Sequence, residues 1–349
     1  MQNLTRASEE LYRRTPDERF ASVADLWDYC QKLKEWSTIR WVPTADVNIG
    51  PMGHSLRLPF NGETFSFNDW SFTQLCSLAG VSKDTVNKLS PETASCVFLE
   101  TLPRGSKPLQ VLTMGDTIRS VHGASYTRLF NVELLTVIRE FAVDFQPPQA
   151  TRVGSNEDPD TPPATGLYCG EQDMFCFFID PTGWTEIEGE PFAPGFFVWN
   201  SEVGRRSIGI QTFWFQAICQ NHIVWDAAEV VEYKRKHTTN VHEALRTVQQ
   251  LIEQLVNKRD QRRDAFVNVI KNAMQTKLGD DVEDVLKVLR KHGIPKAAAA
   301  EALKIAARQG KFTVFSLVDA LTRLARQYEN AGDRTEADAR SSSLLALAV

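Results

Sequence analysis

The feature that most constrains the fold is a change in the spacing of apolar residues part-way along the chain. Before the change, segments rich in aromatic and β-branched residues are bounded by Gly or Pro, as in strands of a mostly buried sheet: 167–180, 195–200 and 206–215. From Val241 onward, apolar residues recur in alternating steps of four and three, which is a helical seam. The two patterns predict an α+β fold, with a central antiparallel sheet between N-terminal helices and a C-terminal helical region.

Local signals divide the chain into five parts. Residues 1–145 are predicted to form a mixed α/β region, with helical, strand and hairpin signals: helices at 8–14, from Ser22, at 71–102 and at 132–145, strands at 56–60 and 64–67, and a hairpin of 109–113 with 117–122. Residues 146–166 hold five Pro and no large aliphatic residue beyond Val153, which predicts a mobile loop or linker. A strand-rich core continuing the same domain (167–238), a helical region (239–330) and a flexible tail (331–349) are expected to follow.

Composition excludes several classes of protein. An apolar share of 42%, with 8 Trp and 20 Phe among 349 residues, can fill a large core. No apolar run approaches the roughly 18–20 residues of a membrane helix, and the start lacks the apolar centre of a signal peptide, so a soluble, cytoplasmic protein is expected. The six Cys form no Cys-x-x-Cys pair and are expected to be reduced.

The usual catalytic fingerprints are missing from the sequence. It contains no phosphate-binding Gly-x-x-x-x-Gly-Lys-Ser/Thr loop, no His-Glu-x-x-His and no Gly-x-Ser-x-Gly. An enzyme activity and a cofactor are therefore not expected.

Charge is distributed unevenly along the chain. Residues 230–311 carry 17 Lys and Arg against 10 Asp and Glu, although the whole chain has a net charge of −5. A local basic face can neutralise phosphates even on an acidic protein. The same residues are also compatible with a solvated helix face, so both interpretations stay open.

The densest functional signal lies between two apolar segments at 195–225. Arg205 and Arg206 follow a polar turn directly and would contact phosphate, while Trp199 and Trp214 would stack bases. The other predicted phosphate contacts are basic residues of the following segments: Lys234, Arg235, Lys236, Arg259, Arg262 and Arg263. The motif itself consists of polar and small residues: Asn200, Ser201, Glu202, Gly204, Cys219 and Asn221. The structural alternative is a capped hairpin turn in which Glu202 pairs with an Arg.

Two further chemistries fit parts of the sequence. Glu171, Asp173 and Glu202 could together hold Mg²⁺ in a nuclease, provided that the fold brings them together. Residues 75–90, with Gly80 at the turn, are similar to a DNA-reading helix-turn-helix, although a plain packed helical pair explains them as well.

A family likeness emerges from short segments spread over the chain. They are 9–20 (EELYRRTPDERF), 70–75 (WSFTQL), 121–129 (VHGASYTRL), 200–204 (NSEVG), 219–221 (CQN) and 319–325 (DALTRLA). In this order they resemble the phage/plasmid-like proteins that are classed only as a domain of unknown function. The resemblance implies a protein of phages and other mobile elements without an established enzyme activity.

The leading hypothesis is non-enzymatic nucleic-acid binding in mobile-element DNA metabolism. Mobile elements commonly carry single-strand annealing proteins, so single-stranded DNA is the expected partner and a homo-oligomer the expected assembly. Binding to a membrane is not expected. The alternatives are a module that binds a host defence protein and the metal-dependent nuclease.

Overall fold

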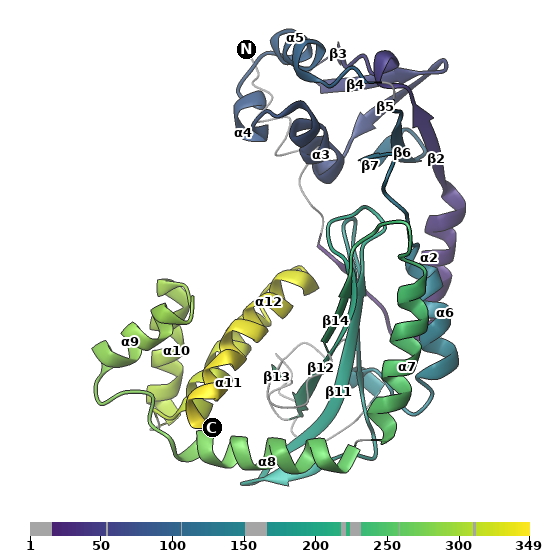
Figure 1. Cartoon of the computed structure of the whole chain (residues 1–349). Helices are drawn as coiled ribbons and strands as arrows, with labels where there is room; N and C mark the ends of the chain where they lie inside the picture. The colour runs from purple at the N-terminus through teal and green to yellow at the C-terminus, as the bar shows by residue number, and fades with distance from the viewer. Residues whose placement is uncertain are drawn as a thin grey trace.

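The chain folds around two sheets that lie one after the other along a curved molecule (Figure 1). The computed structural model describes residues 16–53, 55–105, 107–150, 166–217, 221–223, 232–257, 259–309 and 312–349. Helices and strands both contribute, and the predicted α+β class with a C-terminal helical region is confirmed. The predicted helix at 8–14 and most of the predicted loop at 146–166 lie outside the described residues.

The first sheet has six strands in the described chain, in the order β2-β6-β7-β5-β4-β3. Their bounds are Ser37–Val42 (β2), Gly50–Met52 (β3), Ser55–Phe60 (β4), Glu63–Phe67 (β5), Leu109–Met114 (β6) and Thr117–Gly123 (β7). All neighbours are antiparallel except β5 and β7, which pair in parallel over two residues. With helices α3 (Asp69–Ala79), α4 (Lys83–Val86) and α5 (Pro91–Thr101), this sheet forms what we call the N-terminal unit, residues 37–128.

The second sheet has eight strands among the described residues and is antiparallel throughout. Its strands are Glu18–Arg19 (β1), Leu167–Cys169 (β8), Met174–Ile179 (β9), Thr185–Ile187 (β10), Glu190–Asn200 (β11), Ile208–Gln216 (β12), Asn221–Ile223 (β13) and Glu232–Arg235 (β14). The strand expected over 167–180 is therefore two strands joined by a turn. The long pair β11–β12 forms the centre, and both of its faces are buried.

Helices cover both faces of the second sheet (Figure 1). Their bounds are Val23–Trp36 (α2), Asn131–Phe141 (α6), Glu243–Asn257 (α7), Arg259–Gln275 (α8), Val282–Lys291 (α9), Lys296–Gln309 (α10), Val314–Ala325 (α11) and Ala331–Ser342 (α12); three short 3-10 turns are Thr44–Asp46 (η1), Pro148–Ala150 (η2) and Ser343–Ala348 (η3). Within the described part of the chain, none of these helices has the length and apolar character needed to cross a membrane.

Several helix starts and turns follow directly from local sequence. Ser22 caps α2 by accepting a hydrogen bond from the backbone of Asp25, as the sequence predicts. The predicted hairpin of β6 and β7 turns at Gly115, which has a φ of 57°. Gly80 ends α3 in the left-handed region.

Alternation along β11 sends its side chains to two different cores. Phe196 and Val198 face α2, α6 and α7, and the apolar seam that begins at Val241 packs into this core. The seam is therefore the inner face of α7 against the sheet and α6. Farther along the same face, Phe192 meets Phe266 of α8, which also stacks on Trp214 with ring centroids 4.0 Å apart.

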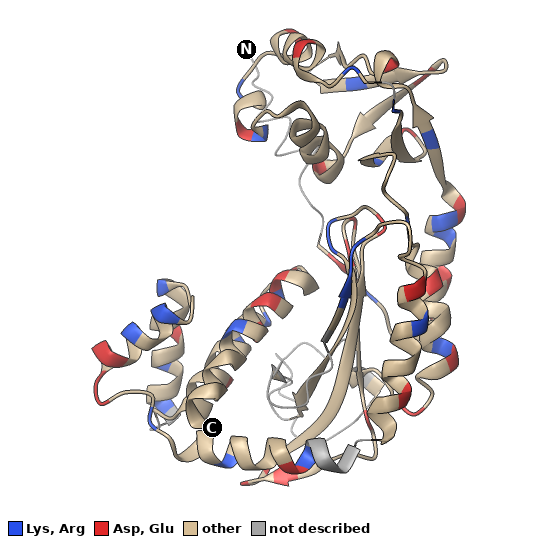
Figure 2. Ribbon diagram, in the orientation of Figure 1, with Lys and Arg blue, Asp and Glu red and all other residues tan. Residues whose placement is uncertain are grey.

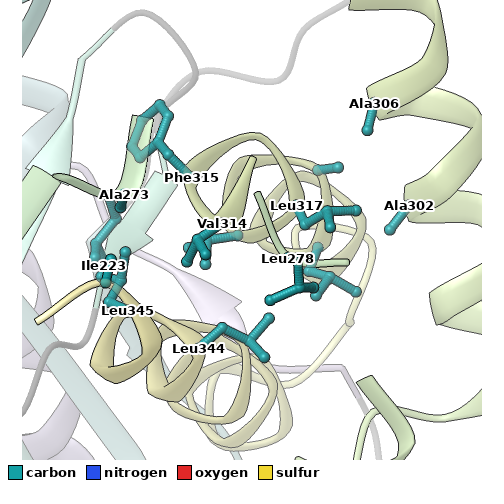
Figure 3. Packing of buried hydrophobic residues seen from close by; sticks show 14 of the residues in the cluster. Ile223, Ala273, Leu278, Ala302, Ala306, Val314, Phe315, Leu317, Leu344 and Leu345 are labelled. Carbon is teal, nitrogen blue, oxygen red and sulfur yellow. The ribbon is translucent and has the colours of Figure 1, made fainter. Parts of the chain in front are cut away.

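The prediction of a flexible tail at 331–349 is wrong. Residues 331–342 form α12, which lies on the opposite face of the sheet, over the aromatic side chains of β9, β11 and β12 (Figure 1). The small residues Ala331 and Ala339 allow this close approach. Leu344 and Leu345 of η3 then enter the core formed with α8 and α11 (Figure 3).

This packing predicts opposite outcomes for two neighbouring leucines. Leu345 is fully buried, so Leu345→Ala should lower the free energy of unfolding by about 2–5 kcal/mol. Leu347 is 44% exposed, and Leu347→Ala should change it by less than about 0.5 kcal/mol. Urea unfolding of the two variants measures the difference. Negligible effects of both substitutions would support the prediction of a flexible tail instead.

Candidate functional site

The Asn200–Gly204 turn joins the two central strands of the second sheet and adopts a fixed conformation. Ser201 stabilises it, because its hydroxyl donates to the carbonyl of Gln172 (2.5 Å) and accepts from the backbone N–H of Arg205 (2.8 Å). Gly204 has a φ of 75°, as its predicted role in a left-handed turn requires. A Cβ at this position would also lie only 2.4 Å from the ring of His122. The turn therefore needs glycine for both conformation and space.

The backbone carbonyls of this turn are held by side chains of the N-terminal unit. The carbonyl of Val203 accepts from three donors: Trp70 Nε1 at 2.7 Å, Gln74 Nε2 at 3.1 Å and His122 Nε2 at 3.0 Å. The carbonyl of Glu202 accepts from the Tyr126 hydroxyl (3.1 Å) and from the Arg128 guanidinium. Buried carbonyls outside helices and sheets require such partners. The turn is thus inserted into the N-terminal unit.

The side chain of Glu202 forms a buried ion pair across the same contact. One carboxylate oxygen lies 3.0 Å from Arg119 Nη2, and the other accepts from the backbone N–H of Asn131 (2.9 Å). The side chains of Glu202 and Arg119 are 1% and 7% exposed, so neither charge is solvated. Asn200 completes the network by donating to the side chain of Asn131 (2.9 Å). The alternative of a turn with Glu202 paired to an Arg is therefore confirmed, with Arg119 as the partner.

Two histidines and a tyrosine form a stack beside the turn. The rings of His122 and Tyr126 lie 3.6 Å apart and nearly parallel, and His237 stacks on Tyr126 at 5.4 Å. Burial lowers the pKa of His122 to about 3 and that of His237 to about 4, and the charge of Arg128 contributes to both shifts. Both imidazoles are therefore neutral at physiological pH and pack as aromatic rings.

Exposed basic residues border the turn. Arg205 is exposed and lies over the indole of Trp70, with its guanidinium carbon 5.3 Å from the ring centroid. Strand β14 pairs with the start of β12, with Lys234 opposite Gly209, so Lys234 and Lys236 are held next to the turn. Both lysines are exposed. Arg235 lies among them and pairs with Glu243 at 3.0 Å. The pairing of β12 with β14 therefore places the basic residues of β14 near the turn that precedes Arg205.

Three other predicted contact residues have structural roles in the fold. Arg206 bridges Asp173 (2.8 Å) and Glu336 of α12 (2.7 Å), so it holds α12 on the sheet. Trp199 and Trp214 are 6% and 3% exposed and pack inside the second sheet's cores, so neither presents a free face to a base. These three residues are corrected from binding to structural roles.

The remaining predicted phosphate contacts, Arg259, Arg262 and Arg263, belong to a segment that is remote from the turn. This segment forms the start of α8, which lies at the other end of the second sheet from the Asn200–Gly204 turn (Figure 2). Arg263 contacts Asp264 at 3.1 Å. The side chains of Arg259, Arg262 and Asn221, and the whole of Cys219, lie outside the described residues.

The alternative chemistries find little geometric support. Asp173 and Glu202 are each paired with a different Arg, and the described part of the chain holds no cluster of three His, Cys, Asp or Glu suited to a metal ion. In the 75–90 segment, α4 spans only four residues, and Lys83 forms an ion pair with Asp69. A single helical turn is too short to serve as a recognition helix in a major groove.

The sequence analysis did not identify the residues that hold the turn, although it named the segments that contain them. Trp70 and Gln74 belong to the segment 70–75, and His122, Tyr126 and Arg128 belong to 121–129. Both segments, together with 200–204, carried the family resemblance. The structure brings all three into contact. Shared membership of the resemblance was thus the signal that could have linked them.

The fold and this site define an α+β protein in which a turn of one sheet is inserted into a second unit. The family described as Domain of unknown function (DUF932) matches residues 180–342, which is less than half of the chain. The match includes the Asn200–Gly204 turn, β14 and helices α7–α12. A search of the curated proteins and a search of the solved structures found no match.

The buried ion pair predicts a large stability effect. Glu202→Gln would leave the Arg119 guanidinium buried without a counter-charge, so the free energy of unfolding should fall by about 3–5 kcal/mol. Glu63 forms a comparable pair with Arg40 but is 55% exposed, so Glu63→Gln should cost at most about 1 kcal/mol. Chemical unfolding measures both, and equal losses would show that burial of the pair is unimportant.

The stacked histidines predict a dependence of stability on pH. Because the pKa of His237 is near 4 in the folded protein and near 6.5 when unfolded, the unfolded chain binds more protons between these values. Stability from this group is therefore present above pH 6.5 and is lost as the pH falls towards 4. In His237→Gln, the slope of unfolding free energy against pH in this window should be shallower by up to about 1.4 kcal/mol per pH unit. An unchanged slope in urea titrations would contradict the buried, neutral state.

Proposed function

We propose that this protein binds nucleic acid without acting as an enzyme, in the DNA metabolism of a phage or other mobile element, with single-strand annealing as the specific activity. The observation that carries the proposal is the group of exposed cations at the inserted turn, defined as Arg205, Lys234 and Lys236. These three residues are called the basic corner.

The basic corner has the properties of a phosphate-binding surface. Its residues come from two adjacent segments whose positions are fixed by the β12–β14 pairing and by the turn. Fixed cations lose less conformational freedom when a phosphate binds than cations on a flexible segment. The guanidinium of Arg205 lies over the ring of Trp70, and this cation–π contact restrains it further. Binding of this kind depends on charge rather than base sequence and would suit annealing of any strand.

The test is the salt dependence of binding. The combined changes Arg205→Ala, Lys234→Ala and Lys236→Ala should make the negative slope of log affinity against log salt shallower by about 2 for a single strand, since each phosphate contact contributes about 0.7 to its magnitude. Arg206 is left intact because its ion pairs hold α12. Fluorescence anisotropy of a labelled oligonucleotide at four salt concentrations gives the slope.

A matched control removes the same charge elsewhere. Lys291, Lys296 and Lys304 are exposed on α9 and α10, and their triple replacement by Ala should leave the slope unchanged. Equal loss in both triple variants would show a non-specific charge effect. Absence of binding by the unmodified protein at low salt would refute the proposed function. A strand-pairing assay with two complementary labelled oligonucleotides then tests annealing directly.

A further inference from the structure

The edge strand of the N-terminal unit and the end of the helix that precedes it expose large aromatic side chains. Trp36, the last residue of α2, is 63% exposed, and Trp41 on β2 is 50% exposed. Ile39, two residues before Trp41 and on the same face, is 39% exposed. Strand β2 is at the edge of its sheet in the described chain. Sheet edges are normally protected with charge or cover, so an exposed aromatic edge indicates a binding surface.

Strand register connects this edge to the inserted turn. Trp41 lies opposite Gln110, and Gln110 lies opposite His122, so the three residues form one row across β2, β6 and β7. Two strand spacings put roughly 10 Å between the ends of the row. At its inner end, His122 Nε2 lies 3.0 Å from the carbonyl oxygen of Val203 in the turn. The ring stack of His122, Tyr126 and His237 then reaches the position directly after Lys236. One bound strand can therefore reach from Trp41 to the basic corner.

Exposed lysines lie at both ends of the aromatic segment. Lys32 precedes Trp36 by one helical turn and is on the same side of α2. Lys107 is exposed in the loop whose Gly105 carbonyl accepts from Thr44, close to the end of β2. Aromatic rings flanked by cations match the alternating bases and phosphates of a single strand. Two paired copies of β2 would instead bring Lys32 of one copy near Lys107 of the other, and like charges would repel.

We propose that Trp36 and Trp41 stack the unpaired bases of the strand whose phosphates lie on the basic corner. This inference rests on the proposed function and specifies its ligand: single-stranded nucleic acid, read by shape and stacking. Trp36 and Trp41 replace the buried Trp199 and Trp214 as the base-stacking residues.

The test separates stacking from charge. Combined Trp36→Ala and Trp41→Ala should weaken binding of a labelled oligothymidine by roughly tenfold or more, because each stacked base contributes substantially to affinity. The salt slope should stay unchanged, since no cation is removed. Combined Trp36→Phe and Trp41→Phe should retain most of the affinity. Binding of a duplex, whose bases are already stacked, should not respond to the alanine changes.

The control variant removes exposed apolar surface elsewhere. Met52 on the opposite edge strand and Leu99 on α5 are 56% and 52% exposed, and their replacement by Ala should leave affinity unchanged. Wild-type affinity in the Trp→Ala variant, with weakened binding in the basic-corner variant, would overturn stacking but keep phosphate binding. If the Trp→Ala variant had a lower molecular mass in solution than the unmodified protein but the same affinity, the edge would be assigned to contact with a second copy, and the proposal would be overturned. No binding by the unmodified protein would refute the proposed function itself.

Discussion

The buried pair of Glu202 and Arg119 is the interaction on which the arrangement of the two sheets depends. Each sheet has its own hydrophobic core, and the contact between them at the turn is polar. A buried carboxylate is tolerated only with a counter-charge and further hydrogen bonds, which fixes the relative position of both partners. Arg119 lies on a strand of one sheet and Glu202 in a turn of the other. Their pairing therefore determines how the two units are oriented.

Hydrogen bonds to the backbone carbonyls of the turn also fix the orientation of the two units. Val203 and Glu202 present backbone oxygens that no helix or strand satisfies, and their donors come from α3, β7 and the segment after β7. A rotation of one unit against the other would break several of these bonds together and leave buried groups without partners. A polar contact of this kind specifies a single orientation more strictly than apolar packing, which tolerates small shifts.

Local elements could be predicted from the sequence because their signals are local. The cap at Ser22, the β6–β7 hairpin and the left-handed Gly204 each depend on residues within a few positions. The partner of Glu202 could not be predicted, because Arg119 lies 83 positions earlier and only the sheet topology brings it near. Likewise, periodicity cannot assign Trp199 and Trp214 to a free face when both faces of their strands are buried.

Helix α12 shows why composition misled the prediction of the tail. Its sequence, AGDRTEADARSS, is typical of a solvated segment, yet small residues on one side let it approach an aromatic sheet closely. Two of its acidic residues form ion pairs, Glu336 with Arg206 and Asp338 with Arg334. Arg206, which looked like a phosphate contact from its position after the turn, is part of this structural pairing. Only the exposure of each cation in the folded chain separates the two roles.

The same distinction explains how the proposed binding surface is organised. Trp41 belongs to the N-terminal unit and Trp36 ends the helix α2 before it, while the basic corner belongs to the second sheet and the turn. A strand that contacts both would lose affinity if the two units moved freely, because their ordering would oppose binding. The buried pair removes that motion in advance. The charged residues that cannot touch a ligand thus determine the geometry in which the exposed ones can act.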